Sequence, residues 1–157
     1  MTRLTDNGID NIQLVQKIAA SQFPDEPVLQ QLTTCQAILE SNLFGIPSEL
    51  AMRYCNLFGI KGEGTNGTVG LQTKEVEDGN TNNVNADFAC NNSVEDSVAQ
   101  YVHLLEHGVS WNHGQYDRVL EAPSFIAATK ALVVCGYATD PEYSDKLMNI
   151  YNKVYSN

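Results

Sequence analysis

Glycine is concentrated in the middle of this chain, and its distribution limits the folds that the chain can adopt. Six of the eleven glycines lie between residues 59 and 79, whereas the segments 28–40 and 94–107 contain none. Glycine disfavours helices, and Asp78-Gly79 is typical of a two-residue hairpin turn. We therefore expect a small β lobe at about residues 57–90, with strands at 69–76 and 83–88.

Apolar residues recur with a helical period on both sides of this lobe. The pattern predicts helices at residues 9–20, 28–40, 47–55, 94–107, 123–136 and 141–155. Proline stands near the first turn of three of them, and Ser93 is a suitable N-cap for the helix at 94–107. The fold class is therefore α+β, mostly helical with one β-hairpin lobe.

The length of 157 residues allows one adequate core, so we expect a single domain over 1–157. The net charge of −10 disfavours nucleic acid as a partner, because phosphate binding needs clustered Lys and Arg. No apolar run approaches the ~20 residues of a membrane span, which predicts no membrane insertion. The first eight residues lack the apolar core of a signal peptide, so we expect a cytoplasmic location on synthesis.

The cysteines and histidines give no strong signal for a cofactor or a metal. Cys35, Cys55, Cys90 and Cys135 are widely spaced without a C-x-x-C pair, which favours buried free thiols over a disulfide. His103 and His107 are four residues apart, but the H-E-x-x-H pattern of zinc enzymes is absent. We expect neither a metal nor another cofactor.

One carboxylate stands out because of its position. Glu40 ends an apolar helical run, within Gln36-Ala37-Ile38-Leu39-Glu40-Ser41. A carboxyl group held against apolar side chains has a raised pKa and can stay protonated near neutral pH. Such a group can act as the general acid that cleaves a glycosidic bond, although many buried helices also end in Glu.

Several short motifs follow one another in a recognisable order. Residues 37–41 read A-x-L-E-S, and residues 56–61 read N-L-F-G-I-K; after them come Thr73-Lys74-Glu75, Ala86-Asp87-Phe88, Asp96-Ser97 and Gly136-Tyr137-Ala138-Thr139-Asp140-Pro141. In this order the segments resemble the glucosaminidase domain of glycoside hydrolase family 73, over residues 28–155. The resemblance implies a lysozyme-like fold with a substrate cleft between a helical body and the β lobe.

The resemblance also implies catalytic roles. Glu40 corresponds to the general acid of the family, and Glu75 to a second carboxylate that activates water. Glu77 shares a strand face with Glu75, so the choice between them stays open. Substrate assistance by an acetamido group is an alternative to inversion. Tyr137 is implied to line the cleft beside the N-acetyl sugar.

Further residues are expected to bind substrate. By resemblance, Asn56, Phe58 and Lys61 line the cleft or form its turn, and Phe58 has a competing role in the core. Many family members carry Gly-Trp-Gly after the position of Ser41, where this chain has Asn42-Leu43-Phe44-Gly45, so Phe44 is expected to replace the tryptophan. Trp111, the only tryptophan, is equally suited to stack on a sugar or to anchor a core.

The functional hypothesis is a peptidoglycan hydrolase that cleaves the β-1,4 bond after N-acetylglucosamine. Its expected setting is a phage lysin or virion protein that reaches wall glycan strands in the periplasm through a holin or a virion. One alternative is a muramidase or lytic transglycosylase acting on the same glycan. Another is a non-catalytic module that binds wall sugar or assembles a phage tail.

Overall fold

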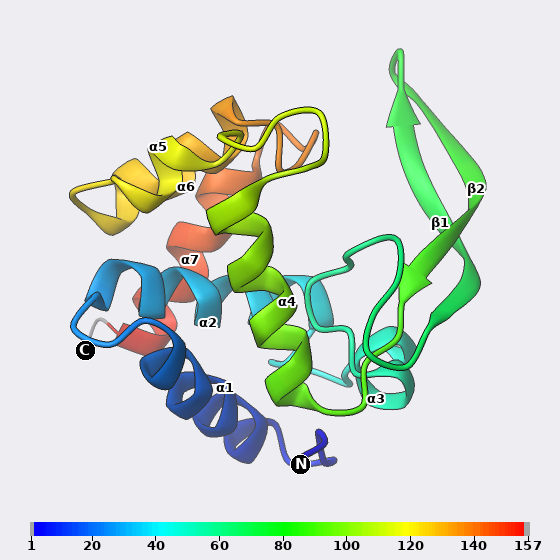
Figure 1. The fold of residues 1–157 in the computed structure, drawn as a ribbon, viewed down its shortest axis with the longest axis horizontal. Coiled ribbons are helices and arrows are strands. Elements are labelled where there is room, and N and C mark those ends of the chain that lie inside the picture. Colours follow the sequence, from blue (N-terminus) through cyan, green and yellow to red (C-terminus); the bar gives the residue numbers. More distant parts are fainter. Residues whose placement is uncertain (1, 156–157) are drawn as a thin grey trace.

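The computed structural model of the chain describes residues 2–155, with the side chain of Glu75 excepted. Helices dominate, and one long hairpin interrupts them (Figure 1). The elements are α1 (Gly8–Gln22), α2 (Pro27–Ser41), α3 (Glu49–Tyr54), β1 (Thr68–Glu77), β2 (Asn80–Ala89), α4 (Val94–His107), α5 (Asp117–Leu120), α6 (Phe125–Val134) and α7 (Tyr143–Tyr155). The predicted α+β class is confirmed, and every predicted helix is present.

Helix α2 lies at the centre of the helical body. It packs against α1, α6 and α7, and every residue from Leu32 to Ile38 is buried. A helix that is buried on all faces must satisfy its polar side chains internally. Accordingly, the Thr33 hydroxyl donates to the Leu29 carbonyl oxygen at 2.7 Å. The rigid surroundings of α2 fix the position of its last residues, including Glu40.

Serine and asparagine side chains cap several helices, as their positions in the sequence suggest. The predicted cap is confirmed at Ser93, whose hydroxyl accepts a hydrogen bond from the Asp96 backbone N–H at 3.1 Å. Ser124 does the same for Ala127, so α6 starts two residues later than Pro123. These bonds satisfy backbone donors that the first helical turn leaves unpaired.

Strands β1 and β2 form an antiparallel hairpin that pairs from Thr68↔Ala89 to Glu77↔Asn80. Asp78 and Gly79 both have positive φ values, 52° and 80°, which confirms the predicted turn. The strands are longer than predicted. Their outer residues are polar and exposed, so backbone pairing continues where the pattern of side chains gives no signal.

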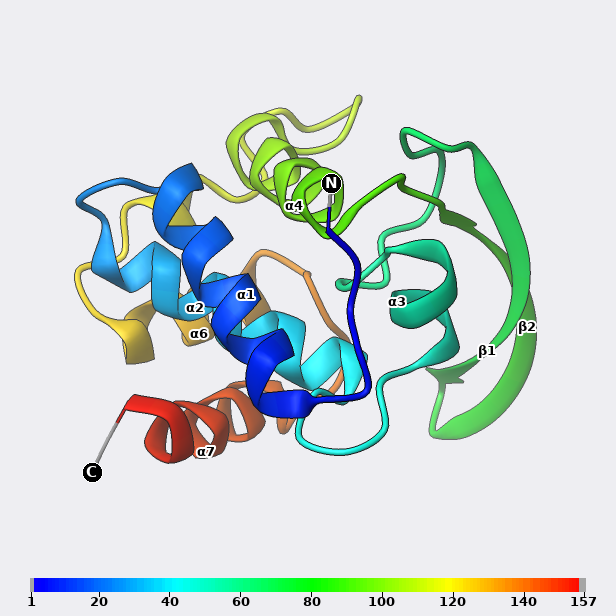
Figure 2. The ribbon, with the colours of Figure 1, turned by 90° about the horizontal axis from the view of Figure 1, so that it is seen from below.

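A short segment extends the sheet at the base of the hairpin. The backbone N–H of Ala89 donates to the Ile60 carbonyl oxygen, and that of Gly62 donates to Asp87, both at 2.9 Å. Figure 2 shows α3 between the hairpin and the helical body. The hairpin therefore meets the rest of the molecule at its base, where Thr68 pairs with Ala89. The turn at Asp78-Gly79 lies at the far end (Figure 1).

Two further features complete the fold. Helix α5 has only four residues and was not predicted, because one turn is too short to show a helical period. All four cysteines are free, as predicted, and Cys135 is only partly buried. No helix within residues 2–155 has the length and apolar character needed to cross a membrane.

Candidate active site

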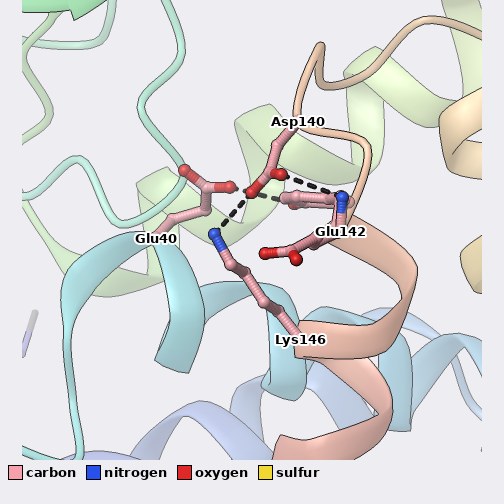
Figure 3. A network of polar contacts seen from close by, with 5 residues as sticks. Glu40, Asp140, Glu142 and Lys146 are labelled. Atoms are coloured by element: carbon pink, nitrogen blue, oxygen red, sulfur yellow. Dashed lines mark hydrogen bonds and ion pairs between the residues drawn. The ribbon is translucent and has the colours of Figure 1, made fainter.

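Glu40 lies at the C-terminal end of α2, facing the start of α7. In the view of Figure 3, its carboxyl group points toward the segment that carries Asp140, Glu142 and Lys146. The Tyr143 hydroxyl donates a hydrogen bond to Oε1 of Glu40 at 2.9 Å. The other oxygen, Oε2, borders Gly59, where a Cβ atom would lie 3.8 Å from it. The α2 end, the 55–61 turn and α7 therefore meet at this carboxyl group.

The surroundings of Glu40 favour its protonated form. Burial against protein atoms raises the pKa of this carboxyl group, and the hydrogen bond from Tyr143 only partly opposes that effect. The C-terminal end of α2 also carries the negative end of the helix dipole, which acts in the same direction as burial. Residue 40 as a whole is nevertheless exposed to solvent, so the burial of its carboxyl group is incomplete and a ligand can approach it. An accessible carboxylic acid with a raised pKa is suited to donate a proton.

Tyr143 and Gln36 contact this site, although the sequence did not identify them. Gln36 precedes Glu40 by one helical turn, and its Nε2 donates to the Tyr143 hydroxyl oxygen at 2.9 Å. Tyr143 lies 103 residues from Glu40 in the chain. Nothing local distinguishes it from the other six tyrosines, and its place two residues after Pro141 was the only available signal.

The structure places Tyr137 in an aromatic cluster beside this carboxyl group. Its ring lies 6.1 Å from Tyr143, 6.4 Å from Tyr101 and 5.9 Å from Tyr116, measured between ring centroids. Within the described residues, its hydroxyl is one of two buried side-chain polar groups without a hydrogen-bond partner, and Gln115 Oε1 is the other. Burial raises the pKa of Tyr137 well above its usual value, so the hydroxyl is a neutral donor.

Asn56 and Phe58 shape the turn beside Glu40. The Asn56 amide donates to the carbonyl oxygens of Ile60 and Ala89 at 2.8 and 2.9 Å, and its Oδ1 accepts from the Ile60 N–H. Phe58 is 3% exposed and stacks on Tyr101 with 4.2 Å between centroids. These contacts agree with the turn-forming role expected of Asn56 and with the core role expected of Phe58. A direct contact of either residue with substrate stays a prediction.

Lys61 and the hairpin carboxylates lie in the β lobe. Lys61 is exposed, and its backbone forms a bridge with Phe88 at the base of β2. Glu75 pairs with Asn82 across the hairpin, but its side chain lies outside the described part of the chain. Glu77 pairs with Asn80 next to the turn and is exposed. Both glutamates therefore lie in the outer half of the hairpin.

Two expected substrate-binding residues, Phe44 and Trp111, are exposed aromatic side chains in loops. Phe44 follows α2, is 49% exposed and has Lys153 Nζ 5.5 Å from its ring centroid. Trp111 is 84% exposed, which excludes the core-anchor role. It lies in the loop between α4 and α5, which is yellow-green and projects toward the hairpin in Figures 1 and 2.

Neither the histidine pair of α4 nor the hollow beside α4 involves the expected site residues. The rings of His103 and His107 lie 4.5 Å apart, yet within the described residues no group of three or more His, Cys, Asp or Glu side chains could hold a metal ion. A shallow hollow of about 350 Å³ lies at the base of the hairpin beside α4 and contains none of the expected site residues; it is lined by Glu63, Gly64, Thr65, Asn91, Asp96, Ala99 and Gln100.

Comparison with known proteins adds to this geometry. Residues 16–156 match the glucosaminidase family, described as mannosyl-glycoprotein endo-beta-N-acetylglucosaminidase. The exo-glucosaminidase LytG of Bacillus subtilis is 41% identical over 126 residues, which is 80% of this chain and 44% of that protein. The peptidoglycan hydrolase FlgJ of Escherichia coli is 36% identical over 103 residues, which is 64% of this chain and 31% of that protein. This chain thus spans less than half the length of these relatives.

Solved structures show the same fold. The catalytic domain of the autolysin Auto from Listeria monocytogenes superposes with a TM-score of 0.80 at 28% identity, covering 98% of this chain and 87% of that one. The glycoside hydrolase domain of FlgJ from Salmonella typhimurium, in a C-terminally truncated form, superposes with a TM-score of 0.64 at 26% identity, covering 97% and 98%. The predicted lysozyme-like α+β architecture is therefore confirmed.

Proposed function

This chain belongs to the glucosaminidase family, and on that premise we propose that it hydrolyses the β-1,4 bond after N-acetylglucosamine in bacterial peptidoglycan, with Glu40 as the general acid. The proposal is carried by the environment of the Glu40 carboxyl group. This group is accessible and accepts a hydrogen bond from Tyr143, and burial raises its pKa. In the reaction, Glu40 donates its proton to the glycosidic oxygen as the bond to the anomeric carbon breaks. The leaving sugar departs as a neutral alcohol.

The remaining site residues have proposed roles as well. Glu75 on β1 activates a water molecule, unless the acetamido group of the substrate attacks the anomeric carbon itself. The register of the hairpin supports either Glu75 or Glu77, because alternate strand positions share a face. The Tyr137 hydroxyl lacks a partner in the structure and is proposed to bind the N-acetyl group after a local shift. Lys61, Phe44 and Trp111 are exposed and are proposed to contact the glycan.

We propose that residues 1–157 act as one catalytic domain and that peptidoglycan glycan strands are its partner. The helices pack around one continuous apolar core, which supports a single folding unit. We further propose cytoplasmic synthesis followed by holin-dependent release or delivery on a virion. The four free thiols support synthesis in a reducing compartment.

Mass spectrometry of fragments released from purified peptidoglycan tests this function. The proposal predicts fragments that end in a reducing N-acetylglucosamine, released by the wild-type protein and not by the Glu40→Gln variant. A reducing N-acetylmuramic acid would instead identify a muramidase, and an anhydro-muramic end would identify a lytic transglycosylase. Absence of any new glycan end would support a non-catalytic module. Fragment lengths also separate internal cleavage from removal of terminal sugars.

A further inference from the structure

A buried chain of hydrogen bonds leads from α4 to the Glu40 carboxyl group. The Tyr101 hydroxyl donates to Gln36 Oε1, and the Gln36 Nε2 donates to the Tyr143 hydroxyl oxygen at 2.9 Å. The Tyr143 hydroxyl donates in turn to Oε1 of Glu40 at 2.9 Å. Gln36 and Tyr101 are fully buried, and Tyr143 is 3% exposed. Solvent therefore does not compete for the first two bonds, whereas the bond from Tyr143 to Glu40 is only partly buried.

The donors and acceptors of this chain all point in one direction. A tyrosine hydroxyl has one proton, whereas a glutamine amide has distinct donor and acceptor ends. Tyr101 uses its proton on Gln36 Oε1, which turns the Gln36 NH₂ group toward Tyr143. The Tyr143 oxygen then accepts from Gln36, and its own proton is directed to Glu40.

This direction determines which oxygen of Glu40 can carry the acid proton. Because Oε1 accepts from Tyr143, the proton of the neutral acid resides on Oε2, the oxygen that borders Gly59. Once that proton has been donated, Glu40 is a carboxylate and the bond from Tyr143 becomes charge-assisted and stronger. An interaction that strengthens as the reaction proceeds lowers the barrier.

We propose that Tyr101, Gln36 and Tyr143 form a positioning relay that orients Glu40 and directs its acid proton to Oε2. The inference rests on the proposed function, because it assumes that Glu40 donates a proton. Phe58 belongs to the same assembly as a support, since its ring stacks on Tyr101 at 4.2 Å. The relay thus connects the 55–61 turn, α4, α2 and α7 to one carboxyl group.

Other ionisable residues surround Glu40, and only Tyr101 among them is substituted in the test. Tyr137 and Tyr101 lie close enough to interact with its charge, and both stay neutral because burial raises their pKa values. In the view of Figure 3, Asp140 and Glu142, which precede α7, and Lys146 within α7 lie on the α7 side of Glu40. Asp140 and Lys146 form an ion pair at 2.5 Å, so the charges of these two side chains offset each other.

The test replaces Tyr143 by Phe, which keeps the ring and removes the hydroxyl. Hydrolysis of soluble, uncross-linked glycan strands is followed by the release of reducing ends across a range of pH. The kcat is expected to fall about tenfold with little change in KM, since a hydrogen bond to a charged group is lost. The alkaline limb of the kcat profile should move to higher pH, because the carboxylate loses a donor and the pKa of Glu40 rises further.

Two variants serve as control and as a test of the chain of bonds. Tyr151→Phe lies on the same helix and stacks on Phe125, outside the relay, and should change neither kcat nor the pH profile. Tyr101→Phe should give a smaller effect of the same sign. The double variant Tyr101→Phe/Tyr143→Phe should be no worse than Tyr143→Phe alone, because both act through one bond.

The outcomes separate this inference from the proposed function. A folded Tyr143→Phe protein with wild-type kcat and an unmoved alkaline limb would overturn the relay while leaving Glu40 as the acid. Additive losses in the double variant would also overturn it. If Glu40→Gln retained activity, the proposed function itself would fail.

Discussion

The hydroxyl of Ser41 donates a hydrogen bond to the carbonyl oxygen of Leu57 at 2.6 Å, across 16 residues of chain. The Leu57 N–H in turn donates to the Ser97 hydroxyl oxygen at 3.0 Å. These two bonds tie the end of α2 to the 55–61 turn and to α4. They explain why Glu40 lies beside Gly59, because Ser41 directly follows Glu40 and Leu57 lies two residues before Gly59.

The stability of the protein should depend on the ionisation of Glu40. Burial raises the pKa of Glu40 in the folded state, so its stabilising contribution is present below the unfolded pKa and is lost as pH rises through the folded pKa. The Glu40→Gln variant should therefore melt at a higher temperature than wild type at pH 7, and this advantage should shrink toward pH 4. Thermal denaturation at both pH values measures it, with Glu106→Gln as a control for one lost charge. An equal difference at both pH values would contradict the assignment.

The two hairpin glutamates should differ in their importance. Glu75→Gln is expected to lower wall hydrolysis by at least about tenfold, because a general base typically contributes that much or more. Glu77→Gln, two residues nearer the turn on the same face, should have little effect. Release of reducing ends from purified peptidoglycan measures both variants. If the larger loss follows Glu77→Gln, the motif match at Thr73-x-Glu75 assigns the wrong carboxylate.

Trp111 should affect binding of the glycan but not folding. Because its side chain is 84% exposed, Trp111→Ala should leave the melting temperature unchanged. Loss of one aromatic contact is expected to weaken binding of glycan strands about two- to tenfold. Trp111→Phe should retain most of the affinity. Binding is measured in the Glu40→Gln background to prevent hydrolysis, and unchanged affinity of Trp111→Ala would remove this residue from the binding surface.

The loop that carries Trp111 should depend on Gly108. This residue has φ 62° and ψ −149°, a region that only glycine adopts readily, and a Cβ atom here would lie 2.2 Å from the Asn112 carbonyl oxygen. Gly108→Ala should therefore lower the free energy of unfolding by about 2 kcal/mol or more. Gly79 also has positive φ but no atom near its Cβ position, so Gly79→Ala should cost only about 1 kcal/mol. Chemical denaturation compares the two, and equal losses would show that the contact with Asn112 is unimportant.

Local patterns in the sequence identified most of the fold. The helical periods, the Ser93 cap and the Asp78-Gly79 turn depend on neighbouring residues, and all three are present in the structure. Helix α5 left no such signal because it is one turn long. The outer ends of β1 and β2 were missed because backbone pairing, not side-chain burial, maintains them.

The candidate site was predicted less completely, and the reason is also physical. The position of Glu40 at the end of an apolar helix was visible in the sequence. Its contacts with Tyr143 and, through it, with Gln36 depend on how α7 packs against α2, which no local pattern specifies. Asn56 was expected to line the cleft or to form its turn, and its amide bonds the backbone of Ile60 and Ala89, which agrees with the turn-forming role.

The most direct test of the account is the activity of Glu40→Gln on purified peptidoglycan. The amide has nearly the same shape as the acid and can still accept from Tyr143, so the fold should be retained, which circular dichroism verifies. It cannot donate an acid proton, so release of reducing N-acetylglucosamine ends should fall by about 10²–10⁴-fold. Near wild-type release by the folded variant would contradict the assignment of Glu40 as the general acid.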